Sequence, residues 1–272
     1  MSNRIFKQNE FSSMYHRYMP PPSQDIIDLI LSYMEKKKAK PYEVAVDVGC
    51  GTGRYTELLA SHFQKVLAFD SSESQINEAK RAGSSKNVQY QVSACENLPV
   101  EDESVDLING ALSVNYFDLD TFFQEAIRIL KPNGCVAFYT IKADFKLEYG
   151  NCSETLTDFF NQVWNACFKY ADKSMEHVLD DFQEIFKALP LSDKTWTTNI
   201  PQTVPITLQD LMGFFRSLYM SHIYADQDPC GAKEFHIRNE KRFQEILGAD
   251  FEKAVMKLHL KHCCVLGCKS SE

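Results

Sequence analysis

The chain has 272 residues, of which 44% are apolar, and this is enough to build one large core. Its 29 basic and 37 acidic residues leave a net charge of −8, which argues against a nucleic acid or an anionic membrane as the partner. No apolar run has the length of a membrane span, the first residues lack the apolar segment of a signal peptide, and the nine cysteines show no framework spacing, so we expect a cytoplasmic protein with reduced thiols.

The first half of the chain alternates between apolar runs of strand length and amphipathic helical stretches. After three prolines, a helix is expected over residues 23–38, with Ser23 as its N-cap. Strands are then expected at 43–49, 65–70, 87–93, 104–112 and 134–141, and helices at 54–63, 72–83 and 119–131. Such alternation predicts a parallel sheet with right-handed crossovers, whose ligands bind at the carboxyl ends of the strands.

The pattern changes beyond residue 142. Residues 153–190 are expected to be mostly helical, 194–204 to form a strand, 207–224 to form one helix opened by Thr207, 233–247 a last helix, and 255–268 a last strand. We see no linker, repeat or low-complexity tract, so the second half should elaborate the first. The expected single domain, residues 1–272, divides into an N-terminal arm and helix (1–40), a core (41–141), and a cap insertion with terminal strands (142–272).

A glycine-rich turn, VAVDVGCGTGRYTELLA at 44–60, joins the first strand of this core to a helix. A dinucleotide fingerprint needs its last glycine where Arg54 stands, and no Lys-Ser or Lys-Thr pair supports a phosphate loop. What remains is a backbone that a ligand can approach closely, with Asp47 placed either to hold an ammonium group or to order the turn. The glycines concerned are Gly49, Gly51 and Gly53.

A second acid, Asp70, ends the next strand. A carboxylate at this position can accept hydrogen bonds from both hydroxyls of a ribose. The alternative is a simple helix cap.

Four segments now follow in order: VDVGCGTG, ACENLP (94–99), SVDLINGALSVNYFD (104–118) and RILKPNGCVAFYT (128–140). Across residues 41–141 they resemble the core of class I S-adenosylmethionine-dependent methyltransferases. The resemblance implies an α/β fold with a Rossmann-like, doubly wound, mostly parallel seven-stranded sheet, a helical N-terminal arm and a helical C-terminal cap insertion. It also implies S-adenosyl-L-methionine as the cofactor, S-adenosyl-L-homocysteine as its product, a small-molecule acceptor, and a monomer or homodimer.

The flanking segments are similar to the trans-aconitate methyltransferase-like branch of small-molecule enzymes. They are YHRYMPPP (15–22) and IPQTVPITLQDLMGFFRSLYMSHIY (200–224). Relatives often have an aspartate where this chain has Ala94, so the backbone around Cys95 and Glu96 is expected to serve the adenine instead. The donor-binding residues that the resemblance implies are Tyr18, Asp47, Gly49, Cys50, Gly51, Gly53, Asp70, Ser71, Ala94, Cys95 and Glu96.

The acceptor is expected near Asn115 and Tyr116, which follow the fourth strand and stand where relatives commonly have His-Trp. With Arg17, they are the candidate catalytic residues. A carboxylate acceptor is ionised at neutral pH and needs no base, and Arg17 or Arg216 could clamp it through two hydrogen bonds. A hydroxyl or ammonium acceptor would need a base, for which the candidates are His16, His222 and Tyr116.

Structural alternatives exist for several of these residues. Simple packing would explain Tyr15, Arg17 and Tyr18 on the arm, Asn115, Tyr116 and Phe117 after the fourth strand, and Arg216, His222 and Tyr224 near the end. Cys263, Cys264 and Cys268 are expected to be buried thiols, and no metal site is expected.

Two other functions stay open: a non-catalytic sensor or scaffold that binds the donor or its demethylated product, and an arsenite-type methyltransferase that uses Cys95 or Cys264.

Overall fold

The computed structural model describes residues 8–271, so the first seven residues of the predicted arm and residue 272 lie outside the described residues. The chain divides into two compact units that interleave along the sequence. We call them the helical unit (Met1–Pro21, Ala143–Lys173 and Pro201–Lys261) and the sheet unit (Pro22–Lys142, Ser174–Ile200 and His262–Glu272). The division of a single domain at residues 40 and 141 stays a prediction. None of the helices within residues 8–271 is both long and apolar enough to cross a membrane.

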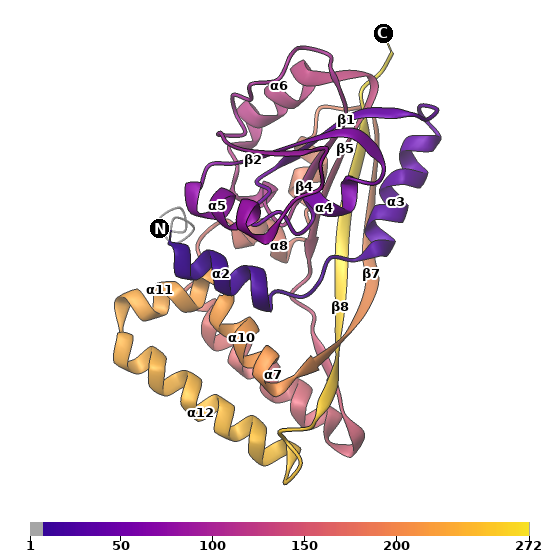
Figure 1. Cartoon of the computed structure of the whole chain (residues 1–272). Helices are drawn as coiled ribbons and strands as arrows, with labels where there is room; N and C mark the ends of the chain where they lie inside the picture. Colours follow the sequence, from indigo (N-terminus) through magenta and orange to yellow (C-terminus); the bar gives the residue numbers. More distant parts are fainter. Residues whose placement is uncertain (1–7, 272) are drawn as a thin grey trace. The chain divides into compact units, whose positions relative to one another are not determined.

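The sheet unit contains the predicted Rossmann-like core (Figure 1). Its parallel strands lie in the order β3-β2-β1-β4-β5. Their bounds are β1 Tyr42–Val48, β2 Phe63–Asp70, β3 Val88–Val92, β4 Val105–Ala111 and β5 Leu130–Ile141. The helices of this core are α3 Gln24–Glu35, α4 Thr56–Leu59, α5 Glu73–Ala82 and α6 Leu119–Ile129. The α/β class and the alternating order of the elements are therefore confirmed.

The sheet has eight strands, where the resemblance implied seven. The long strand β8, Val255–Cys268, runs antiparallel to β5 through its residues 262–268. Its residues 257–259 pair with the short strand β6, Lys146–Glu148, and β7, Asp193–Thr207, also pairs with β8. The three-residue strand β6 is too short to show a period-two pattern in the sequence.

Two predicted helices are wrong in their extent. The helix expected over 54–63 is the four-residue α4, because Phe63 already begins β2, where it pairs with Tyr42 and stacks on its ring at 5.5 Å. The single helix expected over 207–224 is broken at Leu218 into α10, Leu208–Ser217, and α11, Tyr219–Gln227. At the break, the hydroxyl of Ser221 donates to the carbonyl of Phe215, so a side chain replaces a helical hydrogen bond.

The two predicted N-caps behave differently. Thr207 caps α10 as expected, because its hydroxyl accepts a hydrogen bond from the amide of Asp210 at 3.1 Å. Ser23 stands at the N-cap position of α3, but its side chain makes no capping hydrogen bond. Prolines at 20–22 and tertiary packing therefore define the start of α3 without the predicted cap.

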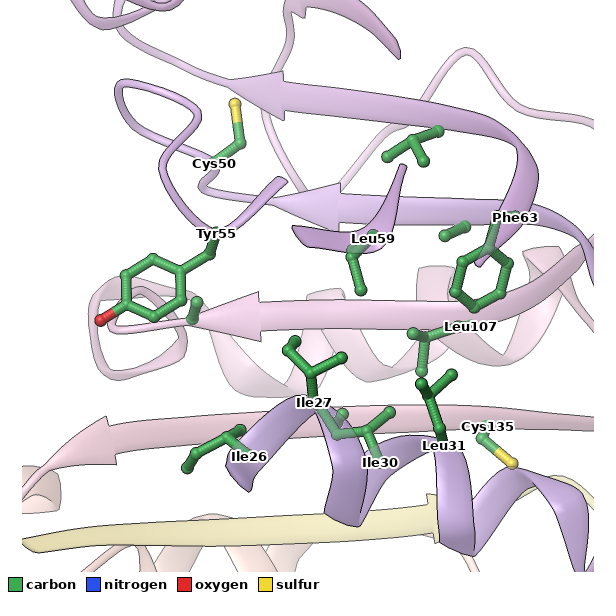
Figure 2. Packing of buried hydrophobic residues seen from close by; sticks show 14 of the residues in the cluster. Ile26, Ile27, Ile30, Leu31, Cys50, Tyr55, Leu59, Phe63, Leu107 and Cys135 are labelled. Atoms are coloured by element: carbon green, nitrogen blue, oxygen red, sulfur yellow. The ribbon is translucent and has the colours of Figure 1, made fainter. Parts of the chain in front are cut away.

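Helix α3 supplies one face of the core of the sheet unit (Figure 2). Ile26, Ile27 and Ile30 are each 1% exposed, and the helical spacing places them on the same side of α3. Figure 2 shows them with Leu107 of β4 and Leu59 of α4 in one apolar cluster. This packing holds the strands whose carboxyl ends carry the candidate site.

The helical unit has an aromatic core of its own. It contains α2 Asn9–Tyr18, α7 Ser153–Phe168, α10, α11 and α12 Pro229–Leu247. The rings of Phe145, Phe160, Trp164 and Phe214 pack with centroid distances of 4.7–6.4 Å. The stretch expected to be mostly helical over 153–190 also includes α8 Met175–Leu179 and α9 Gln183–Ala188, which belong to the sheet unit.

At the amino ends of β1 and β4, the buried carboxylate of Asp106 ties several elements together. It accepts hydrogen bonds from the backbone amides of Glu43 and Val44 at 2.8 and 3.0 Å. The ammonium groups of Lys38 and Lys131 also donate to it, at 2.5 and 3.2 Å. Burial raises the pKa of this carboxyl, but the hydrogen bonds outweigh burial and leave the pKa below its usual range.

We expect Asp106→Asn to lower the free energy of unfolding by about 1.5 kcal/mol, the lower range for hydrogen bonds to a charged group. The matched control is Asp102→Asn, whose side chain is 75% exposed beside Arg128 and should change the free energy by about 0–1 kcal/mol. Since the pKa is lowered, the Asp106 contribution is present above the unfolded-state pKa and disappears as the pH falls through the folded-state pKa. Urea unfolding between pH 7 and pH 3 measures both effects, and equal losses in the two variants would contradict the expectation.

Candidate active site

The glycine-rich turn leaves one position with room for a ligand. Gly49, Gly51 and Gly53 have φ angles of +62°, +54° and +79°, which side chains rarely adopt. A Cβ at Gly49 would lie 2.5 Å from the Cβ of Ser113, and one at Gly53 would lie 2.3 Å from the hydroxyl of Tyr90. These two glycines are therefore needed by the protein's own packing. At Gly51 the nearest atom to a new Cβ is Oε1 of Gln75 at 3.8 Å, an ordinary van der Waals distance, so Gly51 has room that Gly49 and Gly53 lack.

Asp47 orders the glycine-rich turn through hydrogen bonds to its side chain. Its side chain is completely buried and accepts hydrogen bonds from Thr56 Oγ1 at 2.5 Å and from Asn109 Nδ2 at 2.7 Å. Burial raises the pKa of Asp47 to about 6, against the effect of these two bonds. Of its two expected roles, the contacts favour ordering the turn, and a bond to an ammonium group stays a prediction.

Asp70 lies at the carboxyl end of β2, as expected, and holds the turn from the side. Its Oδ2 accepts from the amide of Gly51 at 2.9 Å, and its Oδ1 accepts from the amide of Ser72 at 2.8 Å. Burial raises the pKa of this carboxyl, while the two amide bonds lower it. Each oxygen keeps a second lone pair, so the carboxylate can still accept from two hydroxyls. Ser71 beside it is exposed.

Two further polar groups of this region were missed by the sequence reasoning. Oγ1 of Thr52 and Oε1 of Gln75 are buried and have no hydrogen-bond partner among the described residues. Thr52 belongs to the glycine-rich turn, and Gln75 lies in the first turn of α5, close to the open position at Gly51. Because buried polar groups are nearly always paired, both atoms are candidates for hydrogen bonds to a bound ligand. The sequence signal that could have identified Gln75 is its place shortly after Asp70, at the same end of the sheet.

The loop expected to serve the adenine is held by α6. The amide of Leu98 donates to Glu125 at 2.6 Å, and Arg128 donates to the carbonyls of Leu98 and Val100 at 3.2 and 2.9 Å. Glu125 and Arg128 also form an ion pair at 2.7 Å. These bonds hold the loop that contains ENLP against Arg128, the first residue of RILKP, and so fix the conformation of the loop. Just before it, Ala94 is exposed, Glu96 is half-buried and Cys95 is 8% exposed.

The segment after β4 carries the candidate acceptor residues. Leu112 has a φ of +56°, which is unusual for a large side chain and turns the chain sharply. The hydroxyl of Ser113 donates to the carbonyl of Val48 at 2.9 Å, which ties this segment to the start of the glycine-rich turn. Asn115 and Tyr116 follow in a short 3₁₀ helix, Val114–Tyr116, that contacts α8. Asn115 is buried and Tyr116 is half-buried.

Two predicted site residues lie in the helical unit, on α2. The guanidinium of Arg17 lies 4.9 Å from the centre of the Tyr18 ring. Arg17 is exposed, and within residues 8–271 no carboxylate forms an ion pair with it. The Tyr18 ring packs so closely on Gly213 that a Cβ there would lie 2.2 Å from it. Packing thus accounts for Tyr18, and the roles of both residues at the donor or acceptor stay predictions.

The cysteines are mostly inaccessible thiols. All nine are free, and all except Cys152 and Cys230 are buried. Burial raises the pKa of Cys95, Cys263 and Cys264 above the usual range of a thiol, which makes them poor nucleophiles. Cys50 is 8% exposed and belongs to the buried apolar cluster of the sheet unit, although its backbone lies in the glycine-rich turn. No group of three or more metal-ligating side chains occurs in the part of the chain that the structure describes.

The residues present fit the donor that the sequence implied. Gly51, where a Cβ has room, and the remaining lone pairs of Asp70 belong to one edge of the sheet. The same edge carries the oxygens of Thr52 and Gln75, which have no hydrogen-bond partner within residues 8–271. A ligand with ribose hydroxyls and further polar groups would satisfy atoms that the protein leaves unpaired.

Comparison with known proteins agrees with this geometry. Residues 46–138 match a family described as a methyltransferase domain. A protein of Dictyostelium discoideum named as a methyltransferase is 26% identical over 217 residues, which is 78% of this chain and 76% of that protein. A protein of Saccharomyces cerevisiae named as an S-adenosylmethionine-dependent methyltransferase is 23% identical over 180 residues, 63% of this chain and 59% of that protein. A solved structure titled as a type II methyltransferase from Anaeromyxobacter dehalogenans has the same fold, with a TM-score of 0.69 at 17% identity, and the match covers 94% of this chain and 100% of that chain.

Proposed function

We propose that this chain, which is a class I S-adenosylmethionine-dependent methyltransferase, transfers the methyl group to a carboxylate oxygen of a small organic acid. S-adenosylmethionine supplies a methyl group that is already activated on a positively charged sulfur and leaves a neutral product behind. The protein then has to bind the donor, align the acceptor and exclude water. The trans-aconitate methyltransferase-like branch belongs to the same proposal, because the segment that resembles it, residues 15–22, contains Arg17, which could clamp a carboxylate.

The donor is bound in this proposal by the sheet unit. Asp70 accepts from the ribose hydroxyls with the lone pairs that Gly51 and Ser72 leave unused, and Gly51 lets the donor approach the backbone. Thr52 and Gln75 provide two more buried hydrogen-bonding oxygens. Backbone groups around the same edge of the sheet also line the donor site in this proposal. They come from Gly49, Cys50, Gly53, Ser71 and the 94–96 loop.

The observation that carries the acceptor class is the exposed guanidinium of Arg17, with which no carboxylate among residues 8–271 forms an ion pair. Such a guanidinium can make a bidentate bond to an acidic ligand. The other candidate clamp, Arg216, already donates to Glu240 at 2.9 Å. A carboxylate is ionised at neutral pH and so needs no general base, which agrees with Asn115 and Tyr116 as positioning groups.

The other two functions have less support. A thiophilic acceptor would need an accessible thiolate, whereas Cys95 and Cys264 are buried with raised pKa values. A pure sensor of the donor would not use the exposed guanidinium of Arg17. Methyl transfer to a small acid therefore accounts for more of the described residues.

The test is turnover of methyl-labelled donor with a panel of aliphatic mono-, di- and tricarboxylic acids. We expect Arg17→Ala to raise the Michaelis constant of the methylated acid by about tenfold or more, the equivalent of about 1.4 kcal/mol, and to leave the donor dissociation constant unchanged. Arg17→Lys should recover only part of the loss, because an ammonium group cannot bind in a bidentate manner.

The control is Arg242→Ala, which removes another exposed arginine of the helical unit, paired with Glu245 at the surface. It should leave both constants unchanged. An Arg17→Ala enzyme with the wild-type Michaelis constant, or an acid panel without any product, would contradict a carboxylate acceptor.

A further inference from the structure

A lysine that the sequence reasoning did not single out follows β5 directly, at the carboxyl edge of the sheet. The side chain of Lys142 is 14% exposed, and its ammonium group pairs with Oδ2 of Asp181 at 2.8 Å. The same ammonium group donates to Oδ1 of Asn199, on β7, at 2.9 Å. All three residues belong to the sheet unit. Lys142 therefore connects the end of β5 to two segments that come much later in the sequence.

The backbone of both partners has an unusual conformation. Asp181 and the next residue, Phe182, have φ angles of +57° and +64°, and Asn199 has a φ of +60°. Residues other than glycine rarely adopt this left-handed conformation, and they do so mostly as single residues. Strained backbone of this kind persists only where the surrounding contacts fix it, and it is concentrated at functional sites. The contacts here include the fully buried ring of Phe182 and the indole of Trp196, which donates to the carbonyl of Asp181 at 2.8 Å.

The residues Asp180–Phe182, which we call the strained turn, are joined directly to helix α8. The amide of Phe182 donates to the carbonyl of His177 at 2.8 Å, and the amide of Asp181 donates to the carbonyl of Val178 at 3.3 Å. These two bonds fasten the strained turn to the last turn of α8. A displacement of the strained turn would therefore be passed on to α8.

Helix α8 in turn contacts the short 3₁₀ helix after β4, which carries Asn115 and Tyr116. Within this helix, the amide of Tyr116 donates to the carbonyl of Ser113 at 2.9 Å. The hydrogen bonds of a 3₁₀ helix are poorly aligned, so a single turn depends on its neighbours to hold it in place. Because α8 is one of these neighbours, Lys142 is linked through the strained turn and α8 to the two candidate acceptor residues. Every step of this link lies within the sheet unit.

We propose that Lys142 is a positioning residue for the methyl acceptor: its ion pair with Asp181 holds α8 against the 3₁₀ helix and so fixes where Asn115 and Tyr116 lie. This inference rests on the proposed function, in which those two residues align a small acid. It adds the end of β5 and the segment 174–200 to the acceptor side of the sheet unit. In this role Lys142 acts through the strained turn and need not touch the acceptor.

The ion pair can be removed from either side with little other change. Lys142→Met keeps an unbranched side chain and loses the charge. Asp181→Asn also loses the charge, and asparagine tolerates the left-handed backbone that this position requires. Lys142→Arg can keep both hydrogen bonds and should behave like the wild type. The control is Lys187→Met, which breaks an exposed ion pair with Glu184 on α9, in the same segment of the chain.

The first measurement is hydrogen exchange of the amides of residues 114–117 in the full-length protein without ligand. We expect Lys142→Met and Asp181→Asn each to speed up this exchange by about fivefold or more. The double variant should exceed neither single variant, because both substitutions break the same interaction. Lys187→Met should exchange at the wild-type rate. Wild-type exchange in both single variants, or effects that add in the double variant, would overturn the proposal.

The second measurement is turnover of methyl-labelled donor with the acid of the panel that is methylated fastest. We expect Lys142→Met to lower kcat/KM for this acid by about fivefold or more and to leave the donor dissociation constant unchanged. Lys142→Arg should recover most of the loss. A lysine with only a structural role would lower the urea midpoint of unfolding without this split between acid and donor. Wild-type kcat/KM in the folded Lys142→Met enzyme would contradict a positioning role.

The two levels of inference fail separately. If the panel yields no methylated acid, the proposed function fails, and the exchange measurement by itself decides whether Lys142 holds the 3₁₀ helix in place. If acids are methylated while Lys142→Met keeps wild-type exchange and wild-type kinetics, Lys142 is not a positioning residue and the proposed function stands.

Discussion

We expect Gly51→Val to weaken S-adenosylmethionine binding by about a hundredfold or more, an effect of about 2.7 kcal/mol, while the chain stays folded. Within the glycine-rich turn, Gly51 is the position where a new Cβ meets no protein atom closer than 3.8 Å. A valine side chain would therefore enter the space in which we propose that the donor binds, and its Cβ would not clash with the protein. Gly49 and Gly53 are unsuitable for this experiment, because substitutions there collide with Ser113 and Tyr90.

The control for Gly51→Val must share its backbone strain. Gly150 has a φ of +51°, close to the +54° of Gly51, and a Cβ there would meet nothing within 4 Å. Both valine variants should lose about 1–2 kcal/mol of stability from the left-handed backbone, and only Gly51→Val should lose donor affinity. Calorimetric titration with S-adenosylmethionine measures the difference. Equal donor affinity in the two folded variants would show that the donor does not approach this turn.

The second large effect is expected for Asp70→Ala, which should weaken donor binding by about ten- to a hundredfold. The variant loses a buried, charged hydrogen-bond acceptor, and each such bond contributes about 1.5–3 kcal/mol. The structure adds a complication, because Asp70 also holds the amides of Gly51 and Ser72. Part of the loss would therefore come from a disordered turn rather than from the ribose.

A double cycle separates these two contributions. Wild type and Asp70→Ala are each titrated with S-adenosylmethionine and with an analogue that lacks both ribose hydroxyls. If Asp70 binds the ribose, wild type should prefer the normal donor and the variant should show little preference. The same preference in both proteins would leave Asp70 with only its role in ordering the turn.

Local pattern was enough to predict the order of the core elements and the positions of Asp47 and Asp70 on the first two strands. The apolar run before Asp47 and the one ending in Asp70 read as buried strands, and β1 and β2 lie there. Asp70 ends its strand as expected because a strand's length and end depend mainly on its own apolar residues and on the turn residues that follow. Helix α5 likewise ends at Ala82, one residue before its predicted end, and Gly83 is its C-cap.

The features that the sequence did not predict depend on contacts between residues that are far apart in the sequence. The helix after the glycine-rich turn stops early because Phe63 pairs with Tyr42, and no local signal near residue 60 reveals that pairing. Which glycine of the turn has room for a Cβ depends on Ser113, in the segment after β4, and on Tyr90 of β3. In the same way, Gln75 and Thr52 became candidates only when the structure showed that their oxygens are buried and have no partner among the described residues. Residue identity alone determines what a polar group can bind, but only the packed structure determines whether the protein itself already satisfies it.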